Sequence, residues 1–253
     1  MSLDERSKYL RRQIIRALKG GGRGHVGPAF SLVEIMRVLY DDVLRPEDVC
    51  ILSKGHGCLA QYVMLVEKGL VDAKELDRFC RADGILGGHP EHHIPGITFS
   101  TGSLGHGLSL GIGAALANRA HRIFVIVGDG EINEGSIWEA ALCAGKHKLS
   151  NLTVIVDYNK RQSYDAVAKV QPLEPLALKW RAFGFTVRLL DGHHVRQLQS
   201  CLREPRTTER KPWVMICDTV KGKGVPEIEN HPFWHHKDVF TPEDAVRLEG
   251  GLT

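Results

Sequence analysis

Four apolar runs of strand length, separated by segments with helical periodicity, are the feature that most restricts the fold of this chain. The apolar residues in each run are nearly continuous, whereas a strand with one solvated face alternates apolar and polar side chains. Helical patterns such as IWEAALCAGKH lie between the runs. We therefore predict an α/β fold, a doubly wound, mostly parallel sheet with helices on both faces. The runs are IFVIV (123–127), LTVIV (152–156), FTVRLL (185–190) and WVMICD (213–218).

The segment before these runs has the spacing of helices. Apolar residues recur at helical intervals in YLRRQIIRAL, which ends before the glycines at 20–22. Ser31 stands three residues before Glu34, a capping-box pattern that predicts a helix start at SLVEIMRVLY. CLAQYVMLVEKGL and DAKELDRFC predict two further helices, and Asp72 opens the second.

Length and composition favour one domain. With 253 residues, of which 43% are hydrophobic, the chain can bury a full core. We predict a single domain over residues 1–253, with a peripheral excursion from about residue 225. The net charge of +3 is spread along the chain, which excludes a basic stripe for nucleic acid. No apolar run reaches membrane-spanning length, so no membrane partner is expected.

The cysteines and the N-terminal residues indicate the compartment. Six cysteines are scattered without a CxxC pair, which suits reduced thiols better than a disulfide framework. The N-terminal segment MSLDERSKYLRRQ is charged from its fourth residue and does not have the pattern of a signal peptide. We therefore expect a cytoplasmic protein.

Polar side chains follow two of the predicted strands. Residues 128–135, GDGEINEG, place Asp129 in a glycine turn between a strand and a helix, and the next strand ends in Asp157 and Asn159. Carboxylate and amide oxygens beside a helix N-terminus are suited to Mg²⁺ or Ca²⁺ shared with a diphosphate. A solvated loop with Asp129 as a helix cap explains the same string equally well.

Five of the thirteen histidines stand beside glycines or in polar loops, where core packing does not explain them: His25, His56, His89, His106 and His235. A zinc site in HPEHH or HPFWHH is an alternative, although neither string has the helical two-histidine spacing or a nearby thiolate.

Three familiar motifs are matched only in their letters. GRGHVG fits G-x-G-x-x-G but follows a helix, and GLSLG fits G-x-S-x-G but no strand leads into it. VKGKGV lacks the Ser or Thr that follows the lysine of a phosphate loop. None of the three is therefore assigned its usual function.

Seven strings occur in this order along the chain: GHVG, SKGHG, GGHPE, FSTGSLGHGLSLGIGAALA, GDGEINEGSIWEAA, DYN and TVKGKGV with WHH. Together they resemble the N-terminal half of transketolases, which use thiamine diphosphate, and they follow the family's order over roughly residues 8–236. The spacing from Gly130 to Asn159 also fits the family's thiamine-diphosphate motif, with Tyr158 in place of its first Asn.

The resemblance implies two cofactors, thiamine diphosphate and Mg²⁺. Asp129 and Asn159 correspond to metal ligands, and the backbone carbonyl of Arg161 is the third. The amide of Gly130 corresponds to the group that meets the diphosphate.

Further residues around the coenzyme are implied in the same way. Gly102 and Leu104 resemble residues that line the coenzyme rings. His56 and His235 resemble histidines near the diphosphate and the reaction centre.

The resemblance also assigns residues to the sugar and to an interface. His25 and His89 resemble histidines that contact the hydroxyls of the donor sugar, and proton transfer between hydroxyls suits a side chain that titrates near neutrality. Glu134 and Glu139 resemble catalytically important carboxylates at the interface between cofactor sites.

Three departures from the family pattern bear on substrate identity. His106 replaces a Gln, and His236 replaces the Gly of a WHG string. The segment PEDVCILSKGH lacks the Asp-Arg-Phe that usually precedes its strand.

The implied activity is transfer of a two-carbon ketol unit from a ketose or ketose phosphate to an aldose. In the family, a glutamate from a second domain activates the coenzyme, and few residues remain after position 236. We therefore expect a separate C-terminal subunit, which supplies this glutamate, in an assembly of two copies of each chain. Two alternatives stay open: a subunit that delivers the two-carbon unit to a carrier or an unusual sugar, and a non-catalytic protein that keeps the cofactor.

Overall fold

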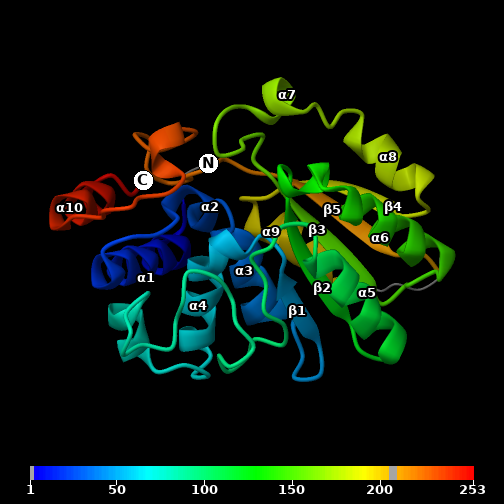
Figure 1. Cartoon of the computed structure of the whole chain (residues 1–253), viewed down its shortest axis with the longest axis horizontal. Coiled ribbons are helices and arrows are strands. Elements are labelled where there is room, and N and C mark those ends of the chain that lie inside the picture. The colour runs from blue at the N-terminus through cyan, green and yellow to red at the C-terminus, as the bar shows by residue number, and fades with distance from the viewer. Residues whose placement is uncertain (1–2, 205–209) are drawn as a thin grey trace.

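The computed structural model describes residues 3–204 and 210–253, and in these residues one parallel sheet lies between two layers of helices (Figure 1). The five strands of the described chain are arranged in the order β1-β2-β3-β5-β4, and each neighbouring pair is parallel. The predicted fold class is therefore confirmed. The strands are β1 (Val49–Leu52), β2 (Ile123–Gly128), β3 (Leu152–Tyr158), β4 (Thr186–Asp191) and β5 (Trp213–Asp218).

The apolar runs form the strands because both faces of the sheet are covered. In β2, Phe124 and Ile126 pack into one core, whereas Val125 and Val127 pack into the other. Every residue of β2 is buried. β4 lies at the edge of the sheet and is less protected, with Leu189 63% exposed. The four predicted runs thus match β2 to β5.

One helical layer comes from residues 5–67, 195–203 and 242–250, and the other comes from residues 107–182. The first layer consists of α1 (Glu5–Gly21), α2 (Val26–Phe30), α3 (Val33–Val38), α4 (Cys58–Glu67), α9 (Val195–Arg203) and α10 (Pro242–Gly250). The second consists of α5 (Gly107–Ala117), α6 (Gly135–Lys146) and α8 (Leu176–Ala182), with the short α7 (Val167–Val170) before α8. No described helix is long and apolar enough to cross a bilayer.

The predicted capping box at Ser31 is wrong. α2 ends at this residue, and α3 begins after Leu32, which makes no side-chain cap. The Ser31 hydroxyl instead donates to the Pro28 carbonyl at 3.1 Å and to the Asp157 carboxylate at 2.7 Å. Glu34 pairs with Arg11, so the residue pattern reflects buried polar contacts between elements.

The other predicted helices form with small differences. α1 includes the predicted YLRRQIIRAL and ends at Gly22, whose φ of 67° is left-handed. Asp72 caps its segment by accepting from the Lys74 amide at 2.9 Å, but the segment is a 3₁₀-helix. The short helices are the 3₁₀ segments Gly55–Gly57, Ala73–Arg78, Glu131–Asn133 and Pro232–Trp234, and a π-helical turn at Leu39–Val43.

The segment after residue 225 packs against the N-terminal layer. Gly24 and Lys237 form an isolated antiparallel bridge, and α10 lies beside α1 (Figure 1). Trp234 and Phe240 are buried in the same core as α1. This packing brings the WHH string to the sheet edge where β1, β2, β3 and β5 end.

Candidate functional site

A cavity of about 430 Å³ lies beyond the carboxyl ends of β1, β2, β3 and β5. The buried residues that follow β3 pack into the core of the second helical layer, whereas those that follow β5 pack into the core of the first. The chain therefore leaves these two neighbouring strands toward opposite faces of the sheet. Such divergence opens a crevice between neighbouring strand ends in parallel sheets, and ligands bind there. The lining includes His25, Lys54, His56, Gly102, Leu104, Asp129, Gly130, Glu131, Asn133, Glu134, Asn159, Arg161, Gln162, Ser163, Lys221 and His235.

Asp129 provides a carboxylate at this cavity. The side chain is only 2% exposed and accepts hydrogen bonds from the amides of Gly130, at 2.8 Å, and Lys160. Burial and the nearby charge of Asp157 raise the pKa of Asp129 to about 7. A bound cation would relieve both effects because it compensates the buried charge.

Asn159 lies beside this carboxylate at the end of β3. Its Oδ1 accepts from the Arg161 amide at 3.0 Å, and its Nδ2 donates to Asp157 at 3.2 Å. Asp157 is fully buried and pairs with the Lys54 ammonium at 2.5 Å. Burial alone would raise the pKa of Asp157, but the Lys54 charge and hydrogen bonds hold it below its usual value. Asp157 therefore supports Asn159 from beneath the cavity.

Five imidazoles gather at the cavity and its margin. The rings of His25, His56 and His235 form a triangle in which every pair of ring centroids is 5.5 Å apart. The ring of His89 is 6.3 Å from that of His25, and the ring of His236 is 4.3 Å from it. Loops distant in the sequence thus converge on His25.

The imidazoles of His25, His56 and His235 are neutral near pH 7. Burial is the largest cause that lowers the pKa of His25 to about 3, and the neighbouring His236 adds to it. Burial and the positive charge of Lys221 lower the pKa of His235 to about 3 as well. Burial and the Lys54 ammonium hold the pKa of His56 well below its usual value. Each ring can therefore accept a hydrogen bond from a hydroxyl through one nitrogen and donate through the other.

Glycine at position 102 is needed for this arrangement. Its φ of 138° is strained for other residues, and a Cβ there would lie 2.9 Å from the His89 ring. Gly55 packs equally closely, because its Cβ would lie 2.9 Å from the backbone of Gly102. The glycines of SKGHG and STGSLG therefore let His89 approach the cavity.

The structure brings the predicted site residues together at this cavity except for Glu139 and His89, and His89 packs against Gly102 at the margin. Gly102, Leu104 and Glu134 line the cavity, but Glu139 does not; it is exposed farther along α6. His106 is exposed and faces the Leu104 carbonyl at 3.3 Å. The Gly130 amide, which the resemblance assigns to a diphosphate, here donates to the carboxylate of Asp129.

Two lysines at the site were not predicted as site residues. Lys54 lies in SKGHG, two residues before His56, and Lys221 lies in VKGKGV. The Lys221 ammonium donates to the Gln162 carbonyl at 3.0 Å, and burial lowers its pKa to about 8. The proximity of Lys54 to His56 was the only signal for the first, and the loose phosphate-loop match was a signal for the second.

Glu131 is a third unpredicted residue. Its carboxylate accepts from the Ser53 hydroxyl at 2.5 Å and from the amides of Gly105 and Gly128, and burial raises its pKa. These bonds tie the ends of β1 and β2 to the loop before α5, so Glu131 holds the cavity wall together.

Three buried polar atoms at the cavity have no hydrogen-bond partner among the described residues. They are the Asn133 amide nitrogen, the Gln162 amide nitrogen and Nδ1 of His235. Buried polar groups are nearly always satisfied, so these atoms need a hydrogen-bond partner in the cavity, a ligand or a water. Within residues 3–204 and 210–253, no group of three or more His, Cys, Asp or Glu side chains could hold a metal, which gives the zinc alternative no support.

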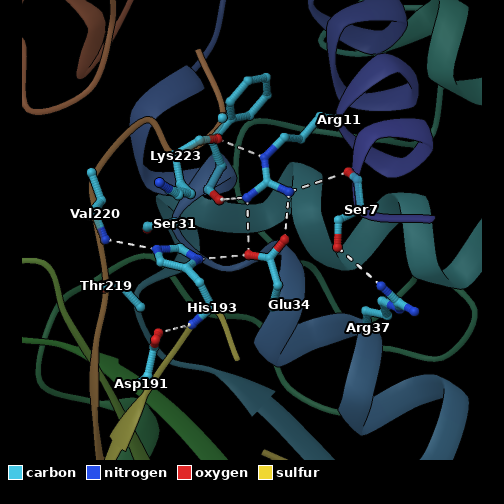
Figure 2. A network of polar contacts seen from close by, with 12 residues as sticks. Ser7, Arg11, Ser31, Glu34, Arg37, Asp191, His193, Thr219, Val220 and Lys223 are labelled. Carbon is cyan, nitrogen blue, oxygen red and sulfur yellow. Dashed lines mark hydrogen bonds and ion pairs between the residues drawn. The ribbon is translucent and has the colours of Figure 1, made fainter. Parts of the chain in front are cut away.

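A second polar network supports the loop that carries Lys221 (Figure 2). The Val220 amide donates to Nε2 of His193 at 2.9 Å, so Nε2 is the acceptor and Nδ1 carries the proton that is donated to Glu34 at 2.8 Å. Glu34 also forms a bidentate pair with the buried Arg11, at 2.6 and 3.0 Å. Arg11 in turn donates to the Lys223 carbonyl at 2.7 Å. The network thus fixes both ends of residues 220–223.

The chain is similar to proteins of known family. A family model described as "Transketolase, thiamine diphosphate binding domain" matches residues 4–243. An apulose-4-phosphate transketolase subunit of Actinobacillus succinogenes is 40% identical, over 98% of this chain and 95% of that protein. The "6-deoxy-6-sulfo-D-fructose transketolase subunit SqwG" of a Clostridium species is 37% identical, over 88% of this chain and 86% of that protein.

Solved structures agree with this relationship. The transketolase of Campylobacter jejuni superposes with a TM-score of 0.87 at 27% identity. The similarity covers 97% of this chain but 42% of that one. From the extent of these matches, the chain belongs to the transketolase family and corresponds to its N-terminal, thiamine-diphosphate-binding domain.

Proposed function

We propose that this chain is the coenzyme-binding subunit of a two-component ketol transferase, which moves a two-carbon unit from a ketose to an aldose. The observation that carries the proposal is a single cavity that combines the oxygen donors of Asp129 and Asn159 with three neutral imidazoles, those of His25, His56 and His235. Such a cavity can bind a metal diphosphate at one end and exchange protons with hydroxyls at the other.

The donor set fits Mg²⁺ and a diphosphate. Asp129 and Asn159 supply the hard oxygen ligands that Mg²⁺ prefers, and the carbonyl of Arg161 would be the third protein ligand. The ammonium of Lys221 provides positive charge for an anion, and the three unsatisfied atoms of Asn133, Gln162 and His235 provide further hydrogen-bonding groups. Gly102 and Leu104 would line the coenzyme rings, and the Gly130 amide would have to turn from Asp129 to the diphosphate.

Thiamine diphosphate, when bound, supplies the carbon nucleophile and electron sink that two-carbon transfer requires. The chain's own residues then bind the sugar and move protons. His25 and His89 would contact the donor hydroxyls, and a neutral imidazole can take up a hydroxyl proton and return it later. His56 and His235 would orient the groups nearest the diphosphate.

A separate C-terminal subunit would complete the site and supply the activating glutamate, in an assembly of two copies of each chain. The names of two relatives, which include the word "subunit", support a partner. The exposed apolar side chains of Leu116 on α5 and Leu142 on α6 support an interface there, near Glu134 and Glu139. All six cysteines are free thiols, which supports a cytoplasmic location.

A specialised sugar is the second candidate for the substrate. The two relatives named above act, by their names, on apulose-4-phosphate and 6-deoxy-6-sulfo-D-fructose. His236, where the family has Gly, packs on His25 at 4.3 Å and would reshape the donor site.

The Asp129→Asn variant tests the proposal. It removes the charge of a metal ligand, so calorimetric titration with thiamine diphosphate and Mg²⁺ should detect an affinity at least about 10-fold weaker, with an unchanged circular dichroism spectrum. Glu243→Gln, which removes an exposed charge on α10, is the control. Unchanged coenzyme affinity in Asp129→Asn would disprove the assignment.

A further inference from the structure

The ammonium of Lys221 lies at the cavity, on the loop of residues 220–223 that follows β5. The residue is only 4% exposed, and its Nζ donates to the Gln162 carbonyl at 3.0 Å. Within residues 3–204 and 210–253, no carboxylate forms an ion pair with Lys221, whereas the ammonium of Lys54 is paired with Asp157. The charge of Lys221 is therefore available to an anion in the cavity.

His193 holds the backbone at the start of this loop (Figure 2). Its Nε2 accepts from the Val220 amide at 2.9 Å, and its Nδ1 donates to Glu34 at 2.8 Å. The imidazole is only 10% exposed. Gly192 permits the close approach, because a Cβ there would lie 2.3 Å from the side chain of Thr219. Two hydrogen bonds thus fix the ring between α3 and the loop.

Loss of the imidazole would free this end of the loop. The Val220 amide would lose its acceptor, and a partly buried amide without an acceptor is costly, so the backbone would move toward another partner. Lys221 is the next residue, and its stem packs closely on Gly27, where a Cβ would lie 3.1 Å from Cγ of the lysine. A shift of the backbone therefore moves the ammonium within the cavity.

We infer that His193 is a positioning residue for Lys221: by accepting from the Val220 amide, it holds the ammonium where it can bind a diphosphate. The inference rests on the proposed function and adds a residue that does not itself line the cavity. A hydrogen bond to a charged group is worth roughly 10- to 100-fold in affinity, so a misplaced ammonium should weaken diphosphate binding by a factor in this range.

The experiment compares two variants of His193. His193→Phe keeps a ring but cannot accept or donate, whereas His193→Gln keeps a carbonyl acceptor for Val220 and an amide donor for Glu34. Calorimetry with thiamine diphosphate and Mg²⁺ is carried out on the full chain, alone and with the C-terminal subunit. We expect affinity at least about 10-fold weaker in His193→Phe and within about 3-fold of the wild type in His193→Gln. His147→Phe, at an exposed histidine away from the cavity, is the control.

A double-mutant cycle separates positioning from a general loss of structure. Lys221→Met removes the ammonium, and His193→Phe should then weaken coenzyme binding by less than about 2-fold further. An equal effect of His193→Phe with and without the ammonium would overturn the inference. An unchanged affinity in His193→Phe, or an equally large loss in His193→Gln, would overturn it as well. His193→Leu, a smaller side chain, replaces His193→Phe if circular dichroism shows that the latter does not fold.

Inorganic pyrophosphate with Mg²⁺ separates the inference from the proposed function. The Lys221 ammonium can bind pyrophosphate without a thiamine group, so the variants can be compared even if the wild type does not bind the coenzyme or transfer ketol units. Pyrophosphate binding that weakens in His193→Phe would then support the inference while the proposed function fails. Pyrophosphate binding that is absent from the wild type, or unaffected by His193→Phe, contradicts the positioning role.

Discussion

The imidazoles of His25 and His235 make the stability of the chain depend on pH. Burial lowers the pKa of both to about 3 in the folded chain, whereas an unfolded histidine titrates near 6.5. The unfolded state therefore binds more protons between these values. The stabilisation is complete above pH 6.5 and is lost as the pH falls toward 3, by at most about 1.4 kcal/mol per pH unit for each ring.

We predict that His25→Asn/His235→Asn loses less stability than the wild type between pH 7 and pH 5. Urea denaturation of the free chain at both pH values measures the difference. His147→Asn replaces an exposed histidine and should keep the wild-type dependence. If the free energy of unfolding falls equally in the double variant and the wild type between pH 7 and pH 5, these two rings do not cause the loss of stability at acidic pH.

At the scale of one element, two interior glycines of α5, Gly111 and Gly113, have different surroundings. A Cβ on Gly111 would lie 2.4 Å from the Val125 side chain of β2, whereas a Cβ on Gly113 would have no atom within 4 Å. Both lie in the interior of the same helix, where Ala is favoured over Gly by about 1 kcal/mol.

The two Ala variants should therefore change stability in opposite directions. Gly113→Ala should stabilise the chain by up to about 1 kcal/mol, through propensity alone. Gly111→Ala should destabilise it by about 1–3 kcal/mol, because the helix must move away from β2. Urea denaturation of both variants is the measurement, and equal stabilisation would contradict the close approach of α5 to the sheet.

The buried pair of Arg11 and Glu34 links α1 and α3 to the loop after β5 (Figure 2). Glu34→Leu leaves the guanidinium without its counter-charge and should cost about 3–5 kcal/mol of unfolding free energy. Arg11→Met/Glu34→Leu removes both charges and should be less destabilising than the single change. A larger loss in the double variant, measured by urea denaturation, would mean that packing around the pair matters more than its charge.

At the scale of the whole molecule, the proposed function requires a partner subunit to complete the cavity. We predict that the purified chain alone binds thiamine diphosphate weakly and does not transfer ketol units, and that the C-terminal subunit restores both. Calorimetry and a coupled ketol-transfer assay, with and without the partner, are the measurements. A rate of about 1 per second or more from this chain alone would refute the split arrangement.

The site residues come from distant parts of the chain, and their proximity was predicted only through the order of family motifs. No local sequence pattern predicts that His25, near the N-terminus, lies beside His235, near the C-terminus, yet their ring centroids are 5.5 Å apart. The arrangement of Asp129 and Asn159 was easier to predict, because both follow neighbouring parallel strands. Lys54 was missed because a lysine before a glycine-flanked histidine is an ordinary surface pattern.

The layered fold could be predicted from local patterns, since uninterrupted apolar runs such as IFVIV can be buried only in a sheet covered on both faces. The oxygen donors that follow β2 and β3 could be predicted in the same way, because the carboxyl ends of parallel strands lie at one edge of the sheet and bring the polar residues after them together. The roles of Ser31 and Glu34 depend on long-range packing, because these residues match a helix cap locally but bond to Asp157 and Arg11. The physical reason is that a buried charge must be compensated wherever the packing leaves it, and packing is not a local property of the sequence.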